Sequence, residues 1–67
     1  MADGAILKAD IMARELRMKD VAREAGMDKS KLSEYIHGDR DLTPTVAAEI
    51  RAAIFRLDAR RRNDGHL

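Results

Sequence analysis

The feature that most constrains the fold is a glycine that separates two short helical patterns in the middle of the chain. The first pattern covers residues 18–25, whose apolar side chains recur at helical spacing. Gly26 follows it, and glycine accepts the left-handed conformation after a helix without a steric penalty. Asp28 is then a good N-cap for the second pattern, which stops at His37 and Gly38. We therefore expect two short helices joined by a tight turn.

Two further helical patterns flank this pair. The first covers about residues 5–16 and carries two sets of apolar side chains at helical spacing. One set is Ile6, Ala9, Ala13 and Leu16, and the other is Leu7 and Ile11. The last pattern begins at Thr43 and Pro44, an N-cap followed by the helical position that suits proline, and it runs to about Arg60. The sequence contains no alternating run of β-branched residues, so we expect no strand. We expect an all-α domain of four helices over residues 1–60, followed by a basic and polar tail, 61–67, that is disordered.

Length and composition exclude several other classes of protein. A chain of 67 residues allows one small domain with a marginal core, and the lack of cysteine excludes disulfides and thiolate zinc sites. His37 and His66 are too few for a metal site, and no nucleophilic triad or glycine-rich phosphate loop is present. We therefore expect no enzyme, cofactor or metal. No segment approaches the ~18 apolar residues of a membrane span, and the N-terminus lacks the pattern of an export signal. We expect a cytoplasmic protein.

The central pair of helices has the geometry of a helix-turn-helix, in which glycine occupies the turn and the second helix packs across the first. A small side chain is needed where the helices cross, and Ala22 supplies it. The positions with turn or packing roles are all filled acceptably; they are Val21, Ala22, Ala25, Gly26, Met27, Leu32 and Tyr35. The alternative is a plain helical hairpin in a small bundle.

The same stretch resembles known DNA-binding domains. Residues 18–28, MKDVAREAGMD, look like the opening of lac-repressor-family headpieces, residues 32–38 continue in that register, and residues 46–57 resemble the third headpiece helix. The helix before the motif and the connection at 38–44, GDRDLTP, are similar instead to Cro/Xre-type repressors. The resemblance covers about residues 10–58 and implies a lambda-repressor-like fold. The chain lacks the hinge and sugar-sensing domain of the lac-repressor family, so we expect no small-molecule effector.

This resemblance implies that residues 29–37 are the recognition helix, with its N-terminal part in the major groove of double-stranded DNA. The expected base-reading residues are Lys29, Ser30, Ser33 and Glu34. Among these, Lys29 could donate to guanine and Glu34 could accept from cytosine. The expected phosphate contacts are Lys19, Arg23, Lys31 and Arg40, with Ser33 as a further candidate. The alternatives are that the lysines are only solvated, and that Glu34 pairs with Lys31 on the same helix face.

The last helix is apolar on two opposite faces. One stripe is Val46, Ile50, Ala53, Ile54 and Leu57, and the other is Ala48, Ala52, Phe55 and Ala59. A monomer can bury only one stripe against the central pair, so we expect the stripe that contains Phe55 to form the interface of a two-fold dimer. The alternative is that the first helix wraps around and covers this face within one chain. The surplus apolar set of the first helix could also line the same interface.

Together these inferences predict a small transcriptional regulator of a bacterium, phage or mobile element. We expect a repressor that binds a palindromic operator as a homodimer. The sequence leaves open whether RNA polymerase or another protein is a further partner. The alternative is an antitoxin or adaptor that uses the same fold to bind a protein. An architectural DNA binder without sequence preference is disfavoured, because the net charge is only +1 and non-specific binding is mainly electrostatic.

Overall fold

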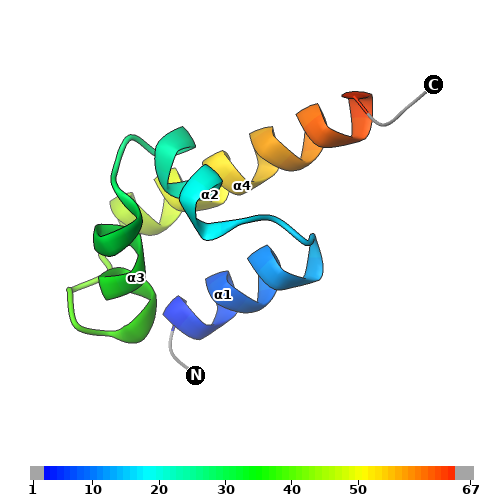
Figure 1. The fold of residues 1–67 in the computed structure, drawn as a ribbon. Helices are drawn as coiled ribbons and strands as arrows, with labels where there is room; N and C mark the ends of the chain where they lie inside the picture. The colour runs from blue at the N-terminus through cyan, green and yellow to red at the C-terminus, as the bar shows by residue number, and fades with distance from the viewer. Residues whose placement is uncertain (1–2, 65–67) are drawn as a thin grey trace.

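The computed structural model describes residues 3–64, and within that range it is all-α, with no strand. The helices are α1 (Asp3–Ala13), α2 (Met18–Glu24), α3 (Lys29–His37) and α4 (Pro44–Asp64). In Figure 1, α4 runs from beside α3 to the upper right, α2 crosses it near the middle, and α1 lies below. α1 and α2 each pack against both α3 and α4. The prediction of a small all-α domain is confirmed for the described residues.

Two of the four helices begin at side-chain caps that the sequence predicts. Asp28 is the N-cap of α3, where its Oδ1 accepts a hydrogen bond from the backbone N–H of Lys31 at 2.8 Å. Thr43 does the same for α4, since its Oγ1 accepts from the backbone N–H of Val46 at 3.2 Å. Pro44 is the first residue of α4, the position where a missing N–H costs nothing.

α1 is shifted toward the N-terminus relative to the expected range of 5–16. It begins at Asp3, so Gly4 lies inside the helix, where it is buried beside Ile36 of α3. A Cβ built on Gly4 would lie 2.3 Å from the carbonyl oxygen of Ile36, so only glycine allows α1 and α3 to approach this closely. The helix ends at Ala13 because Glu15 adopts a left-handed φ of 56°, and the N–H of Leu16 then reaches back to the Ile11 carbonyl at 3.0 Å.

All four helices contribute buried side chains to one core. Its buried members are Leu7, Ile11, Val21, Ala22, Leu32, Ile36, Ile50, Ala53 and Ile54. Of the two apolar sets on α1, Leu7 and Ile11 therefore face the core, whereas Ile6 is 42% exposed. Burying a large aliphatic side chain contributes about 1.5–3 kcal/mol, and the fully buried ones are Leu7, Ile11, Val21, Leu32, Ile50 and Ile54.

α4 extends to Asp64, about one turn beyond the expected end at Arg60. The prediction of a disordered tail is therefore wrong for residues 61–64, and residues 65–67 lie outside the described residues. The helix continues because its last arginines bind other elements. Arg60 Nη2 lies 2.7 Å from Glu24 Oε1, and Arg61 donates to the backbone carbonyls of Arg14 and Glu15. These contacts hold the last helical turn of α4 in place. The same arginines also put positive charge at the C-terminal end of the helix, where the helix dipole favours it.

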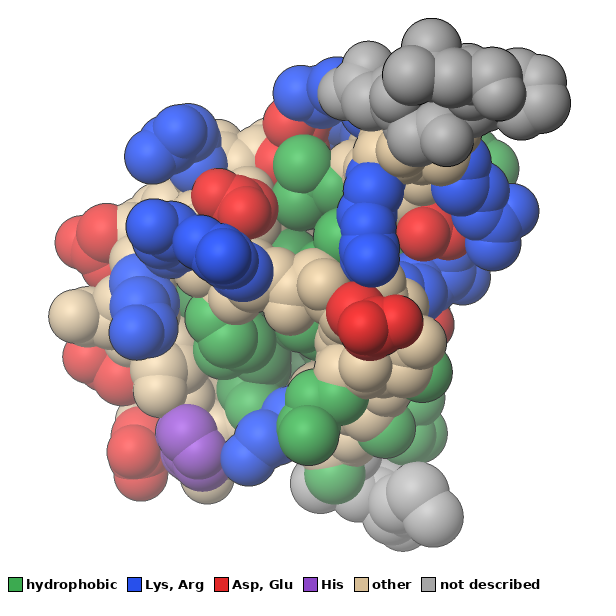
Figure 2. Space-filling model, turned by 45° about the vertical axis from the view of Figure 1, so that its right-hand side comes forward, with side chains coloured by type: hydrophobic (Ala, Val, Ile, Leu, Met, Phe, Trp, Pro, Cys, Tyr) green, Lys and Arg blue, Asp and Glu red, His purple; other side chains and the backbone are tan. Residues whose placement is uncertain are grey.

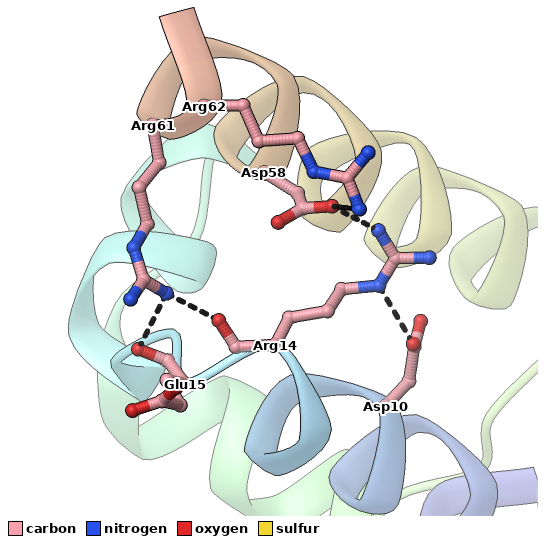
Figure 3. A network of polar contacts seen from close by, with 6 residues as sticks. All are labelled: Asp10, Arg14, Glu15, Asp58, Arg61 and Arg62. Atoms are coloured by element: carbon pink, nitrogen blue, oxygen red, sulfur yellow. Dashed lines mark hydrogen bonds and ion pairs between the residues drawn. The ribbon is translucent and has the colours of Figure 1, made fainter. Parts of the chain in front are cut away.

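A buried carboxylate joins α1 to α4. Asp58 is only 7% exposed, and its Oδ2 is bound by Arg14, the residue directly after α1, and by Arg62 at 3.2 Å (Figure 3). Arg14 also donates from Nε to Asp10 Oδ1 at 2.8 Å. The hydrogen bond to Asp10 is the main cause that raises the pKa of the Arg14 guanidinium above its ordinary value. Since a buried charge left without its partner is strongly destabilising, Arg14 and Asp58 depend on one another.

A second ion cluster holds the end of α2 on α4. Glu24 accepts from Arg56 Nε at 2.9 Å and from Arg60 Nη2 at 2.7 Å, and Arg56 also donates to the Glu24 backbone carbonyl at 3.2 Å. The hydrogen bond from Arg56, followed by that from Arg60, lowers the pKa of the Glu24 carboxyl below its ordinary value.

Within residues 3–64, none of the helices combines the length and the hydrophobicity that a membrane span requires.

We predict that Gly4→Ala destabilises the protein by about 1–3 kcal/mol, because the added Cβ forces α1 away from the Ile36 carbonyl. Urea denaturation, monitored by circular dichroism, measures the change in the free energy of unfolding. Ala9→Leu is the control, because it adds bulk at an exposed position of α1 and should change stability by no more than about 0.5 kcal/mol. An exposed helical glycine would instead gain stability from the change to alanine. A stabilised Gly4→Ala variant would therefore contradict the close approach of α1 and α3.

We predict that Glu24→Gln lowers the melting temperature at pH 7 and that this difference shrinks in acid. The folded-state pKa of Glu24 is lowered, so its contribution is present above the ordinary carboxyl range of about 4–4.5 and is lost as the pH falls through the folded-state pKa. Thermal melts at pH 7 and pH 3 test this. Glu49→Gln is the matched control, since Glu49 is exposed and forms no ion pair with a described residue. A difference from wild type that stays constant with pH would contradict the role of the charge.

Candidate nucleic-acid interface

The turn between α2 and α3 is a left-handed glycine turn. Ala25 is the C-cap of α2, and Gly26 follows with φ of 78°. Residues with a Cβ rarely adopt this conformation. The N–H of Met27 reaches back to the Ala22 carbonyl at 2.9 Å, and the N–H of Gly26 reaches the Arg23 carbonyl at 3.1 Å. These bonds satisfy the last carbonyls of α2 and redirect the chain within four residues toward the N-cap at Asp28.

α3 sits on α2 through buried apolar side chains. Val21 and Ala22 from α2 and Leu32 from α3 are at most 1% exposed. The expected supporting residues, Ala25 and Met27, are partly buried and pack against this cluster, and Tyr35 is 9% exposed. The packing and turn roles that the sequence predicts for these positions are therefore confirmed. That the unit is a DNA-binding helix-turn-helix stays a prediction.

The four predicted base-reading residues lie on α3 but are not equally accessible. Lys29 and Ser30 in the first turn are exposed, whereas Ser33 and Glu34 are half-buried. The Ser33 hydroxyl lies 3.1 Å from Nδ1 of His37, one turn further on, and that nitrogen also lies 2.9 Å from the Ser33 carbonyl oxygen. The freely presented side chains of the predicted set are therefore those at the start of α3.

Glu34 and Arg40, which the sequence assigns to different contacts, bind one another. Glu34 Oε1 lies 2.8 Å from Nη2 and 3.1 Å from Nε of Arg40. The guanidinium also lies over the Tyr35 ring, with its central carbon 5.7 Å from the ring centroid. The structure thus pairs Glu34 with Arg40 rather than with Lys31, the partner considered from helical spacing. Spacing on one helix could not indicate this pair, because Arg40 lies beyond the end of α3.

The other three predicted phosphate contacts are exposed cations. Lys19 and Arg23 lie on α2 and Lys31 lies on α3, and none forms an ion pair with a residue that the structure describes. Arg17, immediately before α2, is a further exposed cation that the sequence reasoning left out. In Figure 2, lysine and arginine side chains gather at the left of the view and again at the upper right, with acidic side chains between them.

The arginine run at the end of α4 is not a free basic patch. Arg60 binds Glu24, Arg61 binds the carbonyls at the end of α1, and Arg62 lies 3.2 Å from Asp58. Each of these arginines therefore has an intramolecular partner. The unpaired cations of the described chain that lie on α2 and α3 are thus the better candidates for contacts with a polyanion.

The second apolar face of α4 is uncovered. Its predicted members, Ala48, Ala52, Phe55 and Ala59, are all exposed. Phe55 is 68% exposed, so the alternative that α1 wraps around and covers this face is wrong. α1 contacts α4 on the flank where Arg14 meets Asp58, and it leaves its own Met12 66% exposed.

Within residues 3–64, no group of three or more His, Asp or Glu side chains is placed to hold a metal ion. Comparison of the chain with known protein families, with curated proteins and with solved structures gave no match.

Proposed function

We propose that the protein binds double-stranded DNA sequence-specifically through α3 and acts as a small transcriptional repressor. The observation that carries this proposal is the arrangement of α2 and α3. One face of α3 is held in the core by Leu32 and Ile36, while its first turn projects Lys29 and Ser30 into solvent. A helix seated on a second helix by a tight turn is the device that places a first turn against base edges in the major groove.

The charges around this face fit the two kinds of DNA contact. Lys29, at the start of α3, donates to guanine O6 and N7, and Ser30 beside it tolerates either base of a pair. Lys19, Arg23 and Lys31 are exposed and without ion-pair partners among the described residues, so they contact phosphates. Phosphate contacts set affinity and register rather than sequence preference.

The exposed stripe on α4 supports a two-fold dimer. Phe55 is the largest side chain of the stripe, and alanines on either side of it allow a second helix to approach closely. Burying an aromatic side chain of this size contributes about 1.5–3 kcal/mol. A two-fold dimer presents two copies of α3 to half-sites of a palindrome about 34 Å apart, or a multiple of that spacing.

The second candidate function is binding of another protein, as in an antitoxin or an adaptor. The exposed Phe55 favours it, because an aromatic residue in an uncovered apolar stripe is typical of a protein interface. In this reading the partner, rather than a second copy, covers the stripe. RNA polymerase is one such partner for a DNA-bound regulator.

We predict that the protein selects a defined sequence from random duplex DNA and that Lys29→Ala relaxes one position of it. The expected loss is about 1–3 kcal/mol of discrimination at a single base pair, because Lys29 is the proposed contact to a base edge. Arg23→Ala is the matched control and should weaken binding to all duplexes alike, with a salt slope smaller by about one. Sequencing of the selected pools and titrations at several salt concentrations measure both effects. Enrichment of no sequence by the wild-type protein would refute specific DNA binding.

We predict that the wild-type protein is a dimer at tens of micromolar and that Phe55→Glu is a folded monomer. A carboxylate at this position would face its own copy across the axis at a desolvated site, which is costly. The fold survives because Phe55 takes no part in the core. Sedimentation and circular dichroism measure assembly and folding separately. Met12→Glu, at an equally exposed site on α1, is the control and should stay dimeric. A monomeric wild type would overturn the dimer and favour the protein-binding alternative for this stripe.

A further inference from the structure

The turn after α3 brings Arg40 back onto the helix that it follows. Gly38 has φ of 85°, and beyond it the backbone N–H groups of Asp39 and Arg40 both reach the Glu34 carbonyl, at 2.9 and 3.2 Å. The chain therefore reverses direction at the C-terminal end of α3. This reversal, rather than helical spacing, places the Arg40 side chain beside that of Glu34.

Three contacts fix the Arg40 guanidinium. Its Nε and Nη2 donate to the same oxygen, Glu34 Oε1, and its central carbon lies over the Tyr35 ring, 5.7 Å from the ring centroid. Tyr35 is itself only 9% exposed and anchored in the core. The guanidinium is thus bound by the Glu34 carboxylate and lies within cation–π distance of a buried ring, although both charged side chains keep more than two fifths of their surface exposed.

The pairing leaves one carboxylate oxygen available. Both donors from Arg40 go to Oε1, and no described residue donates a hydrogen bond to Oε2. An isolated glutamate on a helix surface samples several rotamers, and ordering such a side chain on binding costs about 0.5–1.5 kcal/mol. Arg40 removes part of that cost beforehand.

We infer that Arg40 is a positioning residue that holds the Glu34 carboxylate so that Oε2 accepts a hydrogen bond from a cytosine N4 amino group. This inference rests on the proposed DNA-binding function, and it replaces the phosphate contact that the sequence assigns to Arg40. The cytosine amino group is the donor that a carboxylate reads in the major groove. Arg40 itself need not touch DNA.

The two roles of Arg40 have different consequences. If Arg40 contacts a phosphate, its loss weakens binding to every duplex evenly and lowers the salt slope by about one. If Arg40 positions Glu34, its loss reduces preference at the base pair that Glu34 reads and leaves other positions unchanged. Arg40→Lys separates the roles further, because lysine keeps the charge but lacks the planar pair of donors and the stacking surface.

The experiment measures binding of the wild-type protein, Glu34→Gln, Arg40→Ala, Arg40→Lys and the double variant Glu34→Gln/Arg40→Ala. The targets are the duplex selected by the wild type and a set in which each base pair is replaced in turn. We expect Glu34→Gln and Arg40→Ala to lose preference at the same C·G pair, each on the order of tenfold. The double variant should lose no more than either single variant, since the two residues act as one unit. Arg40→Lys should lose part of the preference with its salt slope unchanged.

Three outcomes would overturn the inference. An even loss of affinity in Arg40→Ala with a smaller salt slope would make Arg40 a phosphate contact. Additive losses at separate base pairs would make Glu34 and Arg40 independent readers. If Glu34→Gln kept full preference everywhere, Glu34 would read no base. In each of these cases the wild type still selects a sequence and the proposed function stands, whereas a wild type that selects none would overturn both. Circular dichroism on each variant confirms that the exposed substitutions leave the fold intact.

Discussion

The left-handed turn at Gly26 is the constraint on which the rest of the molecule depends. It ends α2 and redirects the chain so that Leu32 of α3 enters the same core as Val21 and Ala22 of α2. Once Leu32 is buried, helical geometry decides which side chains of α3 face solvent. The exposed positions of Lys29 and Ser30 thus follow from a backbone conformation three residues before α3 begins. Substitution of Gly26 would strain the turn that positions α3 against α2.

Ion pairs between helices supplement a core that is small for four helices. The arginines at the end of α4 hold the C-terminal ends of α1 and α2, and Asp58 is buried beneath two guanidinium groups. The cost of burying Asp58 is offset only while both arginines stay in place, so this end of the molecule is sensitive to truncation of α4. Much of the positive charge is therefore structural. Among the exposed cations without an ion pair to a described residue, Lys19, Arg23, Lys29 and Lys31 lie on α2 and α3, whereas Lys8 and Arg51 lie on α1 and α4.

The two exposed features, the first turn of α3 and the Phe55 stripe of α4, lie on different elements and call for different partners. A polar and basic helix turn suits base edges and phosphates, whereas an apolar stripe suits a protein surface. The proposed dimer on a palindrome would account for both features, with DNA as the partner of the helix turn and a second copy of the chain as the partner of the stripe. The ion pair of Glu34 with Arg40 adds a third feature, a carboxylate that we infer to be oriented before a ligand binds.

Local chemistry was enough to place the helices of the described chain to within a few residues. Caps such as Asp28 and Thr43 and a left-handed glycine such as Gly26 act on their immediate neighbours, so their effect can be read from adjacent residues. The buried faces of α3 and α4 followed in the same way from helical spacing. The two apolar sets of α1 could not be ranked, because the choice depends on Gly4 meeting the Ile36 carbonyl, a contact between residues far apart in the chain. The partners of the charged residues were also beyond reach: Arg14 with Asp58, Arg60 with Glu24 and Arg40 with Glu34 meet only after the turns and packing bring them together. A long flexible side chain near the surface has many possible partners of opposite charge, and the folded backbone selects among them by distance.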